Sequence, residues 1–169
     1  MIRRLTGALV ILVTSAMLAA CPGTSNVPAK NLLTLINEKR AAAGCAAVVG
    51  NDKLRVAAER HAVDIRDHPA HFGPPGTKTP PNDIHKGTDG SNGGKRIVDA
   101  GYNPKLWGEI IYTSGGPPSN NEQATIDWWM NSPDHKANIE NCGFKEAGVG
   151  LLYPGGVQWI AVVVFGTHQ

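Results

Sequence analysis

The stretch WWMNSPDHKANI, residues 128–139, joins two segments of different character. Two adjacent tryptophans close a segment that suits a helix, and Ser132-Pro133 interrupts it. Serine is a preferred N-cap and proline is favoured at the first helical position, so a second helix is expected to begin here. The stretch therefore predicts a break between two helices, with Trp129 anchoring the first in the core and His135 near the start of the second.

The rest of the chain offers further helix signals. A stripe of apolar residues and a following Gly44 predict a first helix. A second helix follows the capping pair Asn51-Asp52, and its apolar face includes His61. The expected helices cover residues 31–43, the segment after Asn51-Asp52, residues 95–100, a segment from Asn120 or Asn121 to about Asn131, and residues 134–141.

Strands are expected mainly in the last third of the chain. Residues 147–153 and 157–165 flank Pro154-Gly155-Gly156, which is a strong hairpin signal. Residues 106–113, LWGEIIYT, alternate enough to predict another strand. Helices that come first and a hairpin that comes last indicate an α+β fold, with helices around a small, mainly antiparallel sheet.

Residues 67–94 differ from their surroundings because proline and glycine are frequent in them. Such a segment cannot be a continuous helix or a central strand. A loop of this length in a small domain is usually functional or mobile.

The first twenty residues resemble a secretory signal. Arg3 and Arg4 precede an apolar run that is too short for a comfortable transmembrane span. The run ends in Leu18-Ala19-Ala20-Cys21, which resembles a bacterial lipobox and implies cleavage before a lipid-attached Cys21. The alternative is an ordinary signal peptide. We therefore expect an exported protein, with residues 1–20 as signal, 21–30 as a lipid-attached tether to the membrane, and 31–169 as one domain.

After that cleavage the chain has a balanced charge and, besides Cys21, two cysteines. Cys45 and Cys142 could stay as two buried thiols, but an exported protein favours a disulfide, worth up to ~4–5 kcal/mol for a loop of this length. Loss of Arg3 and Arg4 would leave as many acidic as basic residues. Nucleic acid is therefore not an expected partner.

The candidate functional residues are mostly histidines. His61 is expected in the core, His68 and His71 in solvent, and His168 at a frayed terminus. His135, near a helix N-terminus, should favour its neutral form, which accepts protons and binds metals. Glu109, inside an apolar strand, needs solvent or a polar partner. The remaining histidine, His85, lies at the glycine-rich end of the long loop. Spacing alone does not bring these groups together.

Several short motifs, in one order, resemble the bacterial branch of the CAP superfamily, named for cysteine-rich secretory, antigen 5 and pathogenesis-related 1 proteins. The strongest is WMNSPDHKANI. The resemblance runs from Leu32 to Gly166. Its other parts are Asn37 with Arg40, LRVAAERHAVDI (54–65), His85-KGT-Asp89-Gly90, RIVDAGY (96–102), GEII (108–111) and GVG (148–150).

This resemblance implies a three-layer α-β-α sandwich with a cleft lined by two histidines and acids. Carried over by position, the histidines are His85 and His135, and the first acid is Glu109. These three would form the set for zinc or another divalent cation, and some members of the superfamily bind sterols or lipids. The resemblance implies no single activity for the family.

The sequence departs from the family at several positions. Ser132 stands where the eukaryotic branch has a second glutamate; Glu122 could substitute, or it could simply favour the helix dipole. Ile110 replaces the usual asparagine. The long loop leaves His71 as a competitor for the position of His85, although the spacing to Asp89, Gly90 and Arg96 favours His85.

Three functions follow from these residues. The favoured one is a binding module whose cleft holds a divalent metal and a small apolar or lipid molecule. The second is a hydrolase that uses His135 or Glu109 as a general base, with Ser132 as a weaker candidate nucleophile. The third is a surface protein that mediates host or envelope interactions.

Overall fold

The computed structural model describes residues 31–78, 80–153 and 158–169. The expected signal, Cys21, the tether and the turn expected at Pro154-Gly155-Gly156 lie outside these residues. The helices are α1 (Leu32–Ala42), α2 (Asp52–Asp67), α3 (Pro69–Phe72), α4 (Gly93–Asp99), α5 (Glu122–Met130) and α6 (Pro133–Ile139). The strands are β1 (Val49–Gly50), β2 (Pro104–Ser114), β3 (Glu146–Leu152) and β4 (Trp159–His168).

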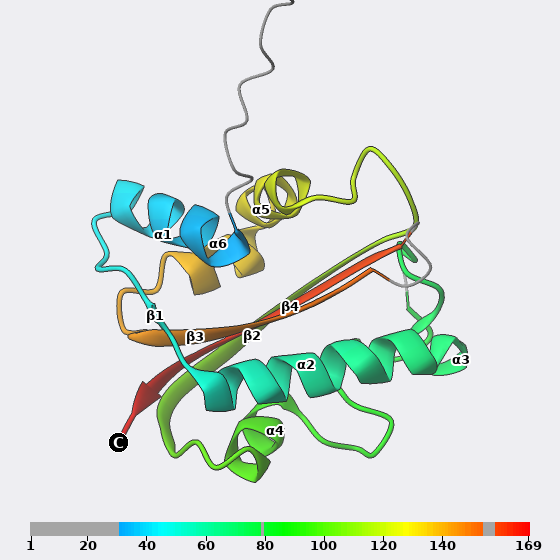
Figure 1. Ribbon diagram of the computed structural model, residues 1–169, viewed down its shortest axis with the longest axis horizontal. Helices are drawn as coiled ribbons and strands as arrows, with labels where there is room; N and C mark the ends of the chain where they lie inside the picture. Colours follow the sequence, from blue (N-terminus) through cyan, green and yellow to red (C-terminus); the bar gives the residue numbers. More distant parts are fainter. Residues whose placement is uncertain (1–30, 79, 154–157) are drawn as a thin grey trace, which may run out of the picture.

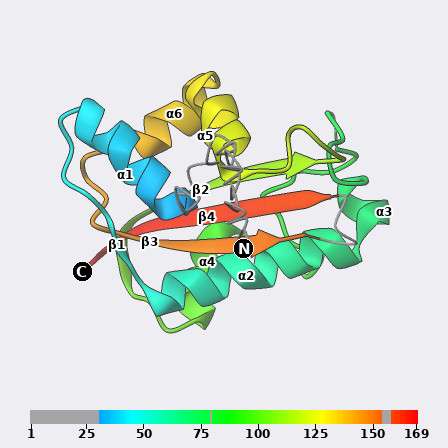
Figure 2. The same cartoon turned by 45° about the horizontal axis from the view of Figure 1, so that its top comes forward.

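The sheet lies between two helical layers. Its strand order is β1-β3-β4-β2, with β1 parallel to β3 and the other neighbours antiparallel. Helices α1, α5 and α6 lie on one side of the sheet, and α2 and α4 lie on the other (Figures 1 and 2). This arrangement confirms the α+β class and the α-β-α sandwich predicted from the sequence.

Both faces of the sheet are buried, and each contributes to a separate hydrophobic core. Trp129 and Trp159 belong to the core beneath α1 and α5, whereas Leu54 and Ile65 belong to the core beneath α2. Residues 108–112 of β2 are buried without interruption. The strand predicted at residues 106–113 is therefore confirmed, and its burial is continuous because helices cover both faces.

Four helices begin directly after an asparagine whose side chain accepts from a backbone N–H in the first turn. The capping residues are Asn31, Asn51, Asn92 and Asn121. This cap removes one unsatisfied donor from each helix start. Asn92 also explains why α4 begins at Gly93, two residues before the expected start.

Helix α2 packs unusually close to β3, and two glycines make this possible. A Cβ atom at Gly150 would lie 2.6 Å from the backbone of Ala58, and one at Gly148 would overlap the backbone of Arg55. Any larger residue would push the helix off the strand. The GVG motif is therefore explained by close packing of backbone on backbone.

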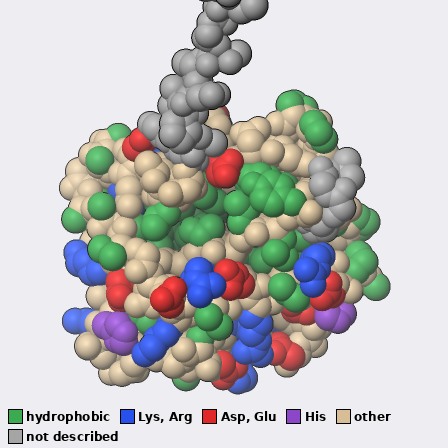
Figure 3. Space-filling view, viewed as in Figure 1, with side chains coloured by type: hydrophobic (Ala, Val, Ile, Leu, Met, Phe, Trp, Pro, Cys, Tyr) green, Lys and Arg blue, Asp and Glu red, His purple; other side chains and the backbone are tan. Residues whose placement is uncertain are grey.

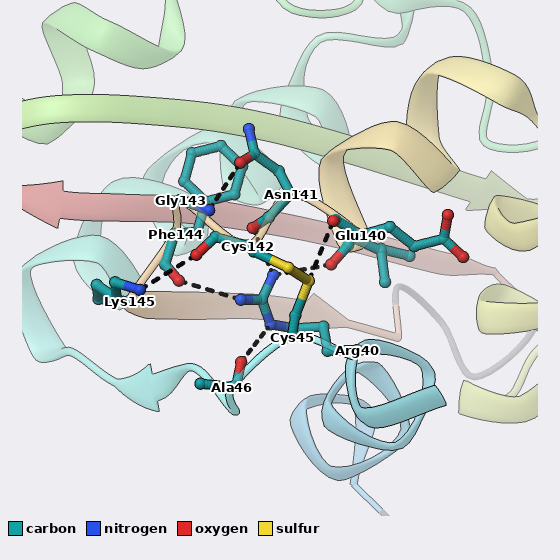
Figure 4. Close-up of a disulfide and its surroundings, with 10 residues drawn as sticks. Arg40, Cys45, Ala46, Glu140, Asn141, Cys142, Gly143, Phe144 and Lys145 are labelled. Carbon is teal, nitrogen blue, oxygen red and sulfur yellow. Dashed lines mark hydrogen bonds between the residues drawn. A yellow bond between two sulfur atoms is a disulfide. The ribbon is translucent and has the colours of Figure 1, made fainter. Parts of the chain in front are cut away.

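The end of α6 is fixed to α1 by a disulfide and by the hydrogen bonds of a buried arginine. Cys45 and Cys142 form the predicted disulfide, with their Cα atoms 4.9 Å apart. Arg40, fully buried on α1, donates to carbonyl oxygens around the same turn, as Figure 4 shows. Its acceptors are Ala46, Ile139, Asn141 and Phe144. The segment that carries His135 is therefore held firmly at its C-terminal end.

One face of the molecule carries a charged helix beside an apolar hollow. Figure 3 shows Lys, Arg, Asp and Glu side chains over α2, with hydrophobic side chains gathered above them. A hollow of about 390 Å³ there is lined by residues that include Leu33, Gly50 and Val149. Among the described residues, no helix is long and apolar enough to span a bilayer.

Candidate functional site

A cleft of about 460 Å³ opens beside the C-terminal end of β2. Its lining comes from β2, α5, α6 and the proline- and glycine-rich segment within residues 67–94, called the Pro-rich loop below. The lining includes both His85 and His135. Glu109 is not part of the lining. It lies behind His85, with a side chain that is only 2% exposed.

The backbone around His85 is held by polar side chains from other elements. The His61 Nε2 atom lies 2.8 Å from the carbonyl oxygen of Ile84. Because a carbonyl only accepts, this nitrogen carries a proton and donates. Arg96 donates to the carbonyl of His85 at 3.1 Å, and Asp83 accepts from the His85 N–H at 2.9 Å. The position of His85 is therefore set by α2 and α4 as much as by its own loop.

The turn that follows His85 is fixed in the same way. Asp64 on α2 accepts from the N–H of Thr88 at 2.9 Å and from its hydroxyl at 2.6 Å. Arg96 donates to the carbonyl of Ser91 at 2.9 Å. The histidine and the aspartate of the LRVAAERHAVDI motif, His61 and Asp64, thus position a loop.

Glu109 forms a buried charge cluster with Arg96 and His85. Arg96 Nη2 donates to both carboxylate oxygens, at 2.9 and 2.8 Å, and the His85 Nδ1 lies 3.0 Å from Oε1. Burial alone would raise the pKa of Glu109, but the His85 hydrogen bond and the Arg96 charge outweigh it and lower that pKa. An ionised carboxylate only accepts, so the His85 Nδ1 carries a proton. In the neutral form of the His85 ring, the proton on Nδ1 leaves a lone pair at Nε2.

His135 is held by its own helix. Its Nδ1 lies 2.7 Å from the Ser132 hydroxyl oxygen. Its ring packs edge-on against Trp128, with the two ring centroids 4.9 Å apart. Burial lowers the pKa of His135, and the positive charge of His85 in its protonated form lowers it further, while Asp134 opposes the shift. His135 is therefore neutral at pH 7, as its place near a helix start predicts.

Ser132 differs from the prediction in one respect. It occupies the N-cap position of α6, but its side chain makes no capping bond to the helix amides. The hydroxyl is turned toward the His135 imidazole, one turn along, and not toward the N–H groups of Asp134 and His135 that a cap would accept from. A residue interpreted as a cap thus contacts a candidate functional histidine.

The other candidate residues lie outside the cleft. His61 is in the core, as predicted, whereas His71 is half-buried against Phe72 and not fully solvated. His168 lies within β4 and contacts Tyr102, so it is not frayed. The remaining positions are exposed His68, Glu122 in the first turn of α5, and core residue Ile110.

The Pro-rich loop forms one wall of the cleft. Gly76, with a φ of 90°, donates its N–H to the Thr113 hydroxyl at 3.0 Å. A Cβ atom at Gly76 would lie 2.6 Å from the backbone nitrogen of Gly115. The loop therefore lies directly against the end of β2, and its length has a structural purpose.

The aromatic residues of the cleft were missed at the sequence level. Trp128 is 48% exposed and lines the cleft beside Tyr112, whereas Trp129 is fully buried and donates to the Ile111 carbonyl. Neighbouring residues on a helix differ by about 100°, so two adjacent tryptophans cannot both face the core. That rule could have identified Trp128.

The described residues contain no group of three His, Cys, Asp or Glu side chains arranged to hold a metal ion. The cleft offers two imidazoles, and Glu109 is already bound by Arg96 and His85. A metal at this site would take its remaining ligands from solvent or from a bound molecule.

Comparison with known families identifies the family of this chain. The model of the cysteine-rich secretory protein family, CAP, matches residues 33–165. The chain belongs to this family. No curated protein matches this CAP chain in sequence.

Solved structures resemble the CAP domain in fold. An outer surface protein of Borrelia burgdorferi has 22% identity and a TM-score of 0.66 over 82% of this chain and 90% of that one. An SCP-domain extracellular protein of Bacillus anthracis has 20% identity and a TM-score of 0.64 over 80% and 38%. A cysteine-rich secretory protein of Staphylococcus aureus has 15% identity and a TM-score of 0.58 over 80% and 37%. The chain thus corresponds to little more than a third of the last two.

Proposed function

We propose that the cleft binds a divalent metal ion, with zinc the first candidate, through Nε2 of His85 and of His135. The observation that carries the proposal is the contact of His85 Nδ1 with ionised Glu109. It fixes the tautomer that leaves Nε2 able to bind a metal. Two imidazole nitrogens with oxygen ligands from solvent or a bound molecule form a set that zinc accepts.

In this proposal Glu109 orients His85 and does not bind the metal itself. Arg96 donates to both carboxylate oxygens, which supports this role. His135 would contribute in its neutral form, with its Nδ1 proton donated to the Ser132 hydroxyl. When bound, zinc would act as a Lewis acid on a ligand oxygen in the cleft.

Calorimetric titration with zinc chloride tests the proposal. We expect saturable binding to the wild type and none measurable after His85→Ala or His135→Ala. Glu109→Gln should weaken binding roughly 10–100-fold, as loss of a partner that orients a metal ligand usually does. His68→Ala, which changes an exposed histidine outside the cleft, is the control. Equal heats of binding for the wild type and both cleft variants would contradict the proposed metal site.

A hydrolase is the second candidate, and one contact favours it. The Ser132 hydroxyl lies 2.7 Å from a neutral imidazole, as a nucleophile lies beside its base. Glu109 is a poor general base because its pKa is lowered. An esterase and peptidase screen, in which Ser132→Ala and His135→Ala keep every rate seen in the wild type, would exclude this function.

Export with attachment at Cys21 is a further part of the proposal. The Cys45–Cys142 disulfide supports an oxidising compartment, and the similar proteins named above are described as extracellular or surface proteins. Mass spectrometry of the mature N-terminus should find a diacylated Cys21. An unmodified cysteine, or cleavage elsewhere, would contradict lipid anchoring.

A further inference from the structure

The cleft contains an exposed aromatic surface. Trp128 is 48% exposed although it belongs to a helix that buries the neighbouring Trp129 completely. Tyr112 lies against it, with ring centroids 5.4 Å apart and a tilt of 55°. Exposed aromatic rings inside a concave site provide a large apolar contact area at a small cost in conformational entropy.

Polar groups surround this surface and are only partly used within the protein. The Thr113 hydroxyl accepts from the Gly76 N–H and so still has a proton to donate. The Thr77 hydroxyl donates to the Pro74 carbonyl and can still accept. One wall of the cleft therefore offers a donor and an acceptor close to an aromatic face.

The ionisable groups that line the cleft do not repel anions. In the described part of the chain, Lys78 and the two histidines line it, and no carboxylate does. The opening also faces solvent along the Pro-rich loop, where Lys78 is exposed. This lining suits a neutral or acidic polar ligand better than a fatty chain, which needs an enclosed apolar channel.

We infer that the cleft binds a saccharide, with the apolar C–H face of one sugar ring stacked on Trp128. A pyranose ring combines an apolar face with hydroxyl groups around its edge. The apolar face matches Trp128, and the hydroxyls match Thr77 and Thr113. The inference rests on the proposed function in one respect, because the saccharide occupies the same cleft as the metal.

The test follows the indole N–H signals of the four tryptophans by NMR, with EDTA present. The probes are tetra-N-acetylchitotetraose, which is neutral, tetragalacturonate, which is acidic, and sodium dodecanoate. We expect at least one saccharide to shift the Trp128 signal. Trp128→Ala should weaken that binding roughly tenfold, and Trp128→Phe should restore part of it, as expected for the loss of an aromatic contact.

Trp107→Ala is the matched control, because Trp107 is 40% exposed and does not line the cleft. Its affinity for the saccharide should equal that of the wild type. The inference is overturned if neither saccharide binds, if dodecanoate alone shifts Trp128, or if Trp128→Ala binds as the wild type does. EDTA separates this result from the zinc titration, so the metal site can fail while the saccharide site stands, and the reverse.

Discussion

Both walls of the cleft depend on a buried arginine, but the two arginines bind different acceptors. Arg96, behind His85, donates to the carboxylate of Glu109 as well as to backbone carbonyls. Arg40, behind the end of α6, donates to four carbonyl oxygens beside the Cys45–Cys142 disulfide. The first wall is held by an ion pair between two charged side chains, and the second is held by hydrogen bonds from a guanidinium to uncharged carbonyls and by a covalent bond.

This difference has consequences for the two histidines. The ion pair of Arg96 and Glu109 loses its negative charge when the carboxylate is protonated in acid. The carbonyl oxygens around Arg40 and the disulfide do not titrate there. The wall that carries His85 should therefore respond to pH and to the loss of one charge. The wall that carries His135 should tolerate both more easily.

The largest effect is expected from Arg96→Met, which leaves the Glu109 carboxylate buried without its partner. We expect the free energy of unfolding to fall by about 3–5 kcal/mol, as for other broken buried pairs. Urea denaturation measures this change. Arg60→Met is the control: Arg60 pairs with Asp89 and Asp99 at the surface, so its loss should cost at most about 1 kcal/mol. Equal losses would mean that burial of the pair does not matter.

Glu109→Gln should lower the free energy of unfolding by about 2–3 kcal/mol at pH 7. This is less than for Arg96→Met because glutamine still accepts one hydrogen bond from Arg96. The pKa of Glu109 is lowered in the folded protein, so its contribution is complete above the ordinary value of 4.5 and is lost as the pH falls through the lowered pKa. The stability difference between wild type and variant should therefore shrink in acid. A difference that stays constant from pH 7 to pH 2 would contradict an ionised Glu109.

Arg40→Met should cost less, about 1.5–2 kcal/mol, since it leaves neutral oxygens without a donor and the disulfide still holds the turn. The same urea titration, under oxidising conditions, measures it. If Arg40→Met destabilises the protein more than Arg96→Met does, the comparison between the two walls is wrong.

The smallest effect concerns the pKa of His135. Burial lowers this pKa and the positive charge of His85 in its protonated form adds to the shift, so His85→Gln should raise it while leaving it below 6.5. Titration of the imidazole protons by NMR measures the midpoint. His68→Gln should leave it unchanged, and a midpoint that also stays constant in His85→Gln would show that the two histidines are not coupled.

Much of the fold follows from local sequence rules. Helix caps, the Ser-Pro break and the apolar strands predicted the order of the helices and strands apart from α3 and β1, and His61 was correctly assigned to the core. The strand predicted at residues 106–113 is confirmed by β2, but its burial on both faces is a tertiary property. No local pattern reports that a second helical layer covers a strand.

The candidate site was harder to predict from residues alone. His85 and His135 come from distant segments, and only the family resemblance placed them in one cleft. The partnership of Arg96 with Glu109 and the turn of Ser132 toward His135 depend on side-chain directions that spacing does not specify. The exposure of Trp128 was open to a simple rotational argument on the helix.

The Cys45–Cys142 disulfide also has a topological consequence. It joins residues 97 positions apart and so closes a covalent ring that contains α2, the Pro-rich loop and the whole cleft. A protease that cuts an exposed peptide bond within this ring opens the loop but leaves both fragments attached. Under non-reducing conditions the cut protein would keep its mass apart from one added water, and only a reductant would separate the two halves of the cleft.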